Sequence, residues 1–304
     1  MTDSMSLPPA MAQRAREFTG PPAPARPSAT VVLLRPHDDT FQVYVLRRAT
    51  TMAFGGLYAF PGGVVDLSDK GVIGLSGPPA LDTTTGPAIT EQPPPEAVAT
   101  EQALPGGTVD PADHPVTIRT DWPERLGLPP AEAHAVVGAA ARELFEETGV
   151  LLAGPRAEPD RTVTATDTPE WEAERAAVQA RTLSMTDLLA RHELRLRDDL
   201  LLPWSRWITP EFEPRRYDTW FFVALLPEAQ SARDVSGEAS TTAWIPPAET
   251  SLPMLPPTRR TLTEIAAHHT IPEVVAASAH RDAATALTPR IEIAPNGEAR
   301  LQLP

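Results

Sequence analysis

The length, composition and charge of the chain exclude several classes of protein. Its 304 residues, 41% of them apolar, can bury a substantial core, although 36 prolines predict long irregular stretches. A formal charge of −14 and a pI near 4.9 disfavour binding to nucleic acid or to an anionic membrane, since both carry negative charge. Cysteine is absent, which removes disulfides, thiolate metal sites and cysteine nucleophiles. No apolar stretch has the length of a signal peptide or of a membrane span, so we expect a cytoplasmic protein.

The first third of the chain predicts an arm, a strand pair and an insertion. Residues 1–28 are rich in Pro, Ala and Arg and predict a flexible N-terminal arm. Two β-branched and aromatic runs, 29–34 and 41–46, flank a turn-prone segment and predict paired strands. From 67 to 130 the composition shifts towards Pro, Gly, Thr and Asp, which predicts a long insertion.

The middle of the chain predicts helices and further strands. Apolar residues recur at helical spacing from Ala131 to Thr148, and Gly149 is placed as a C-terminal stop. The other expected elements are helices that begin at Thr168-Pro169 and after Ser184, strands at 200–208, 217–226 and 241–245, helices after Pro257 and Pro272, and a hairpin turning at Asn296-Gly297. We assign 251–304 to a C-terminal helical and hairpin extension.

Three glutamates on the predicted 131–148 helix form a candidate metal site. Glu146 and Glu147 follow Glu143 by three and four residues, so the three side chains project from one face and repel each other. Hard cations such as Mg²⁺ prefer oxygen ligands and would relieve this repulsion. Arg142, one turn before Glu146, can orient a carboxylate. The alternative is a solvated acidic face, but the full string Arg-Glu-x-x-Glu-Glu-x-Gly has a chance frequency of roughly one in a million per position.

This string, Arg142–Gly149 with the apolar Val150 after it, resembles the second half of the Nudix box. Phe60-Pro61-Gly62-Gly63-Val64-Val65-Asp66 resembles the glycine loop that opens the box. Here 79 positions separate Gly63 from Arg142, whereas the family has fourteen, so the insertion must leave and return at one place. Counted back from Arg142, the upstream glutamate of the box falls on His134, with Glu132 nearby.

Flanking segments resemble a long-insert Nudix branch linked to coenzyme A diphosphate hydrolysis. They are Leu46-Arg47-Arg48-Ala49, Trp204–Pro210 and Arg215–Thr219. The resemblance implies an α/β Nudix fold over 29–250, in which a mixed β-sheet is sandwiched between α-helices. It also implies hydrolysis of coenzyme A or an acyl-coenzyme A to phosphopantetheine and adenosine bisphosphate products.

The resemblance further implies a role for each candidate residue. Mg²⁺ or Mn²⁺ would be held by Glu143, Glu146 and Glu147. The general base would be Glu147 or Glu238, between which the sequence does not choose, and Arg142 would assist catalysis. The residues expected to contact substrate phosphates are Arg47, Arg48, Gly62, Gly63, Arg215 and Arg216.

Other functions remain open at this stage. A Nudix hydrolase of this kind could act on a nucleotide sugar, a dinucleotide or a nucleoside triphosphate. A nucleotide-binding module without activity is a further alternative, but such a module would be expected to lose box glutamates, and all three are present. In each case we expect a small-molecule partner and neither nucleic acid nor membrane. The sequence leaves the oligomeric state open, with a homodimer as one option.

Overall fold

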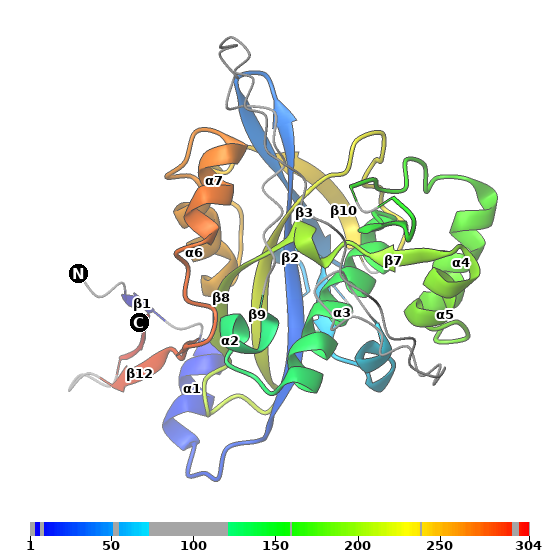
Figure 1. Ribbon diagram of the computed structural model, residues 1–304. Coiled ribbons are helices and arrows are strands. Elements are labelled where there is room, and N and C mark those ends of the chain that lie inside the picture. Colours follow the sequence, from blue (N-terminus) through cyan, green and yellow to red (C-terminus); the bar gives the residue numbers. More distant parts are fainter. Residues whose placement is uncertain are drawn as a thin grey trace, which may run out of the picture.

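The computed structural model describes residues 4–6, 9–50, 55–72, 121–158, 160–237, 239–293 and 298–303. Glu238 and most of the predicted insertion therefore lie outside the described residues. The main sheet has eight strands, and Figure 1 shows it between two groups of helices. Its principal order is β10 (Ala239–Ile245), β3 (Thr40–Arg48), β2 (Ala25–His37), β9 (Arg216–Leu225), β8 (Leu201–Ile208) and β11 (Ala286–Leu287).

The sheet is mixed, because β2 pairs with β9 and β8 with β11 in parallel, while the other pairs are antiparallel. Two short strands lie off this order: β4 (Tyr58–Ala59) pairs with β3, and β5 (Gly62–Val64) pairs with β2. The predicted strands at 29–34, 41–46, 200–208, 217–226 and 241–245 are all confirmed. The β2–β5 pairing brings the glycine loop onto the central part of the sheet.

Strand alternation divides the apolar run of β2 between two cores. Val31 and Leu33 point into the core that contains α3, and Val32 and Leu34 point into the core on the opposite face. Both faces are covered, which explains why this strand reads as a continuous apolar run rather than an alternating one. The predicted sandwich of a mixed sheet between helices is confirmed.

Helix α3 (Pro130–Thr148) carries most of the Arg142–Gly149 string, and its residues from Val136 to Thr148 are buried. It begins with Pro130 at its first position and ends at Gly149, whose φ of 75° is left-handed, as predicted for a C-terminal stop. At Gly138 an added Cβ would lie 2.7 Å from the carbonyl oxygen of Asp69. This close approach lets the 3₁₀ helix η1 (Leu67–Gly71) pack against α3.

Further helices cover the two faces of the sheet. On the side of α3 lie α2 (Trp122–Leu126), α4 (Pro169–Gln179) and α5 (Met185–Arg191), and on the other side α6 (Pro256–Ile265) and α7 (Ile271–Ser278) (Figure 1). The predicted starts of α4 and α5 are confirmed, because Thr168 and Ser184 each accept a hydrogen bond from the backbone amide of the third residue of their helix. The sequence did not predict the small sheet of β6 (Ala153–Pro155) and β7 (Leu194–Leu196), nor η2 (Asp198–Leu200).

The two ends of the described chain meet. Strand β1 (Ser4–Ser6) pairs with β13 (Ala299–Gln302), which pairs in turn with β12 (Arg290–Ile293), and Figure 1 shows these strands beside helix α1 (Pro9–Glu17). The predicted hairpin is therefore present, although its Asn296-Gly297 turn lies outside the described residues. The region 1–28 contains regular structure where the sequence predicts a flexible arm, because α1 buries Ala12 and Arg14 pairs with the buried Glu213.

The predicted insertion also has ordered margins. Residues 67–72 form η1 and its C-cap, and 121–130 include α2, whose Trp122 is buried and donates from Nε1 to Asp198 Oδ2 at 2.8 Å.

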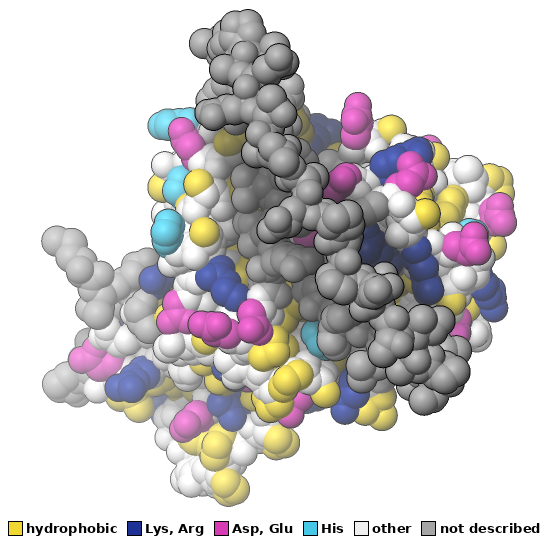
Figure 2. Space-filling model, viewed as in Figure 1, with side chains coloured by type: hydrophobic (Ala, Val, Ile, Leu, Met, Phe, Trp, Pro, Cys, Tyr) yellow, Lys and Arg dark blue, Asp and Glu magenta, His cyan; other side chains and the backbone are white. Residues whose placement is uncertain are grey.

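Figure 2 shows basic and acidic side chains interspersed over the described surface on one face. Within the described part of the chain, no helix combines the length and apolar character needed to cross a bilayer.

Candidate active site

The three box glutamates are buried at the inner side of α3. Glu143, Glu146 and Glu147 expose only 8%, 5% and 7% of their surface. The alternative of a solvated acidic face is therefore contradicted. Buried carboxylates need partners, since burial disfavours their charged form.

Arg142 supplies a fixed partner for these glutamates. Its guanidinium is 1% exposed and donates to Asp69 Oδ1 and Oδ2 (2.7 and 3.0 Å), to Glu143 Oε1 (2.7 Å), to Glu146 Oε1 (3.1 Å) and to the carbonyl of Val64 (3.0 Å). Burial lowers the pKa of Arg142, but the bond to Asp69 and the surrounding carboxylates outweigh this effect and raise it. Arg142 is therefore a permanently charged anchor that joins the glycine loop, η1 and α3.

Asp69 is a member of the site that the sequence did not predict. It is fully buried, and its Oδ2 also accepts the backbone N–H of Asp66 at 2.7 Å in a capping box. Counted forward from Gly63, the upstream acidic position of the box falls on Asp69, six residues on. His134 lies two turns before Arg142 on α3 and does not take this place. The insertion therefore follows this position of the box, and counting from the glycine loop would have found Asp69.

The glycine loop touches the glutamates directly. The N–H of Gly62 donates to Glu147 Oε2 at 3.1 Å. A Cβ on Gly63 would lie 2.4 Å from Glu143 Oε1, and one on Gly62 would lie 2.4 Å from the carbonyl oxygen of Ala29. Both positions require glycine because of close approach rather than positive φ. The amide of Gly62 orients a protein carboxylate, whereas the sequence predicts that it contacts the substrate.

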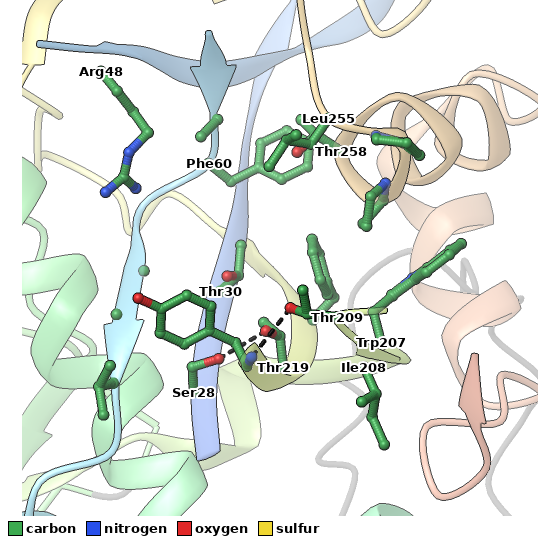
Figure 3. Close-up of a pocket in the computed structure, with 18 of the residues that line it drawn as sticks. Ser28, Thr30, Arg48, Phe60, Trp207, Ile208, Thr209, Thr219, Leu255 and Thr258 are labelled. Atoms are coloured by element: carbon green, nitrogen blue, oxygen red, sulfur yellow. Dashed lines mark hydrogen bonds between the residues drawn. The ribbon is translucent and has the colours of Figure 1, made fainter. Parts of the chain in front are cut away.

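A cavity of about 440 Å³ opens beside these residues. Its wall includes the three glutamates, both glycines and Arg48, together with a mainly apolar and aromatic part formed by Met11, Phe60, Trp207, Ile208, Phe212, Phe221, Leu255 and Leu301. Figure 3 shows Arg48 reaching in from β3, with Trp207 and Ile208 on the other side. Hydrogen bonds shape the wall between them: Ser28 Oγ lies 2.7 Å from Thr219 Oγ1, and the N–H of Tyr217 donates to Thr209 Oγ1 (Figure 3).

The other predicted arginines lie away from this cavity. Arg47 donates to the carbonyl of Gly56, and Arg216 donates to the carbonyls of Thr209 and Ala23, so both support the local backbone. Arg215 is exposed. Of the four arginines expected to contact substrate, the structure brings only Arg48 into the cavity wall.

Two arginines from α4 and its C-terminal end approach the box although the sequence gave no sign of them. Arg175 is buried and donates to the backbone carbonyl of Glu146 at 2.8 Å. Arg181 lines the cavity and donates to Glu146 Oε1. No local pattern marks either residue, because their positions depend on how α4 packs against α3.

The donor chemistry of the site fits a divalent cation. Burial raises the pKa of Glu143 to about 7, with Glu146 adding to the shift and Arg142 opposing it. The surrounding residues therefore neutralise only part of the negative charge of Glu143, and a bound cation would stabilise its charged form. Among the described residues, no three acidic or histidine side chains converge as a ready metal site. In this structure Glu143 and Glu146 point at guanidinium groups instead.

A mixed sheet between helices, with the Arg142–Gly149 string buried next to a glycine loop, is the arrangement of a Nudix hydrolase. The chain belongs to the family described as the NUDT19 Nudix domain, whose model matches residues 16–254. The chain is 28% identical over 267 residues to the human "Acyl-coenzyme A diphosphatase NUDT19". That match covers 82% of this chain and 65% of the human protein, less than two thirds of its length.

One solved structure supports the fold, and a second is similar at lower identity. The crystal structure of a Nudix hydrolase from Alicyclobacillus acidocaldarius is similar to this chain with a TM-score of 0.58 and 24% identity, covering 84% of this chain and 96% of its own. RenU, a Nudix hydrolase from M. smegmatis, is similar at 12% identity with a TM-score of 0.35, covering 83% of this chain and 86% of its own.

Proposed function

We propose that this chain hydrolyses the diphosphate linkage of coenzyme A or an acyl-coenzyme A, giving phosphopantetheine and adenosine bisphosphate products. The observation that carries the proposal is a single cavity that joins the box carboxylates to a long apolar and aromatic wall. A diphosphate needs the first part, and an adenine ring or a pantetheine arm with its acyl chain suits the second. The human relative, named an acyl-coenzyme A diphosphatase, supports this substrate class.

We assign Glu143, Glu146 and Glu147 as the residues that would hold Mg²⁺ or Mn²⁺. Bound there, the ion would neutralise charge on the phosphate oxygens and lower the pKa of an attacking water. The chain's own groups set the geometry: Arg142 fixes Glu143 and Glu146, while the amide of Gly62 orients Glu147. Arg48, in the cavity wall, is the predicted arginine that we retain as a phosphate ligand.

Several expectations drawn from the sequence remain predictions. The general base is Glu147 or Glu238, and only Glu147 lies within the described residues, where it borders the cavity. The division into an arm, a catalytic domain at 29–250 and an extension also stays a prediction, although Met11 from the expected arm and Leu301 from the expected extension both line the cavity. The cytoplasmic location and the homodimer option are likewise predictions.

The test is a substrate panel in Mg²⁺ or Mn²⁺. It should include coenzyme A, short- and long-chain acyl-coenzyme A, a nucleotide sugar, a dinucleotide and a nucleoside triphosphate, with products separated by chromatography. We expect adenosine bisphosphate from the coenzyme A compounds. Cleavage confined to the other substrates would favour the alternative hydrolase, and binding without any cleavage would favour the nucleotide-binding module.

A matched pair of variants tests the metal ligands. Glu146→Gln should lower kcat on the order of 100-fold or more, because it removes a charged oxygen ligand. Glu132→Gln lies on the same helix but is exposed, so its activity should equal that of the wild type. Full metal-dependent turnover by Glu146→Gln would contradict the assignment of the ligands, whichever substrate is cleaved.

A further inference from the structure

Arg181 places a guanidinium group among the box carboxylates. Its Nη1 donates to Glu146 Oε1 and to the carbonyl of Val178 (3.0 Å), its Nη2 lies 4.0 Å from Glu143 Oε1, and its Nε lies 3.8 Å from Asp66 Oδ2. In this arrangement Arg181 supplies positive charge at the same oxygens that would hold a metal ion.

Arg181, unlike Arg142, can move its guanidinium away from the glutamates. Arg142 is 1% exposed and is held by Asp69 and the backbone of Val64 as well as by the glutamates. The Arg181 side chain is 43% exposed and lies at the cavity wall, so its guanidinium can move without uncovering a buried charge of its own. Of the two cations on Glu146, Arg181 is the exchangeable one.

We propose that Arg181 is an exchangeable counter-ion that neutralises Glu146 in the metal-free protein and turns to the substrate diphosphate once that carboxylate holds a metal ion. This inference rests on the proposed function, because it requires both a divalent ion and a phosphate substrate. Glu146 Oε1 accepts from both Arg142 and Arg181, so Arg181 must withdraw before this oxygen can coordinate a metal ion. Its planar fork of N–H donors matches phosphate oxygens, and it already borders the cavity.

The two roles predict effects of opposite sign when Arg181 is replaced. Without its competing charge, Mn²⁺ should bind about 2- to 5-fold more tightly, as expected for loss of a partly exposed ion pair. Without its phosphate contact, KM for the coenzyme A substrate at saturating Mn²⁺ should rise roughly 10-fold. A residue that only supports the local structure would weaken both metal binding and substrate binding.

The experiment measures Mn²⁺ affinity by titration calorimetry and by the spin-resonance signal of free Mn²⁺, and measures KM and kcat in parallel. Two variants are needed: Arg181→Gln keeps most of the side-chain stem, and Arg181→Gly suits the φ of 60° at this position, so it should fold even if the stem matters. Arg181→Lys should restore part of the KM loss, because it keeps the charge without the fork. Arg191→Gln is the control, since Arg191 is 62% exposed and 4.0 Å from Glu174, away from the box.

Tighter Mn²⁺ binding together with a raised KM in both variants supports the exchange. Unchanged or weaker Mn²⁺ binding in folded Arg181→Gln and Arg181→Gly, with normal Mn²⁺ binding by the wild type, overturns this inference alone. Absence of Mn²⁺ binding by the wild type overturns the proposed metal chemistry and the exchange with it.

Discussion

Burial of single charged residues decides the acid–base behaviour of the site. Glu143 sits beside two other glutamates, yet burial is the main reason that its pKa rises from the ordinary 4.5 to about 7. Arg142 limits the rise through its charge and its bond to Oε1. Such a group binds its proton more tightly in the folded than in the unfolded protein. Burial of Glu143 therefore does not destabilise the folded protein below about pH 4.5, and it lowers the free energy of unfolding increasingly as the pH rises towards 7.

This shift predicts a pH-dependent stability difference in the metal-free protein. Glu143→Gln removes the titrating group, so the variant should gain stability relative to the wild type between pH 5 and pH 8, on the order of 1–3 kcal/mol. Urea denaturation at a series of pH values in chelator measures the difference. Glu132→Gln, exposed on the same helix, should show no such trend. A difference in the free energy of unfolding between Glu143→Gln and the wild type that does not change with pH would contradict the raised pKa of Glu143.

At the scale of elements, the site depends on how closely β5 approaches both β2 and α3. Gly62 faces the backbone of β2, where an added Cβ would meet the Ala29 carbonyl oxygen at 2.4 Å. Gly63 faces α3, where an added Cβ would meet the Glu143 carboxylate at the same distance. A backbone atom inside a sheet cannot move away, whereas the end of a side chain can.

Alanine at these two neighbouring positions should therefore have different effects. Gly62→Ala should lower the free energy of unfolding by about 1–3 kcal/mol, because β2 and β5 must separate. Gly63→Ala should cost less stability but lower kcat and Mn²⁺ affinity, because it displaces a proposed metal ligand. Denaturation and Mn²⁺ titration of both variants measure this. Equal loss of stability with unchanged Mn²⁺ affinity would show that the loop does not position Glu143.

At the scale of the whole molecule, the cavity is assembled from distant parts of the chain. Its wall takes Met11 from α1, Trp207 from β8 and Leu301 from β13, while the glutamates come from α3. The small sheet of β1, β13 and β12 joins the described N- and C-terminal segments beside the cavity. The terminal segments thus belong to the proposed substrate site, on the side that would contact the organic part of the substrate.

Replacing a terminal residue should accordingly change substrate binding more than chemistry. Leu301→Ala should raise KM for an acyl-coenzyme A about 5- to 10-fold, with kcat within about two-fold. The reason is that the substrate would lose part of its apolar contact with this buried side chain, a loss on the order of 1 kcal/mol. Ile293→Ala, in the same hairpin but 50% exposed, is the control and should leave both constants unchanged. A fall in kcat at constant KM for Leu301→Ala would argue that the hairpin does not touch the substrate.

The sequence by itself determined most strands of the main sheet, several helix ends and the chemical identity of the box. The α3 helix ends at Gly149 and α4 begins after Thr168, because capping and stop signals are local. The strand pair at β2 and β3 followed from residue types on either side of a turn. The Arg142–Gly149 string was recognisable because all of its members lie within two turns of one helix.

Only the tertiary structure decided which charges meet and which face solvent. The sequence could not show that Glu143, Glu146 and Glu147 are buried, since helical periodicity places them on one face without saying what covers that face. Asp69 and Arg181 join the box across 73 and 35 positions of sequence, and Arg47, Arg215 and Arg216 stay out of the cavity wall. Local patterns fix backbone conformation, but the partners of a buried charge depend on packing between elements that are distant in the chain.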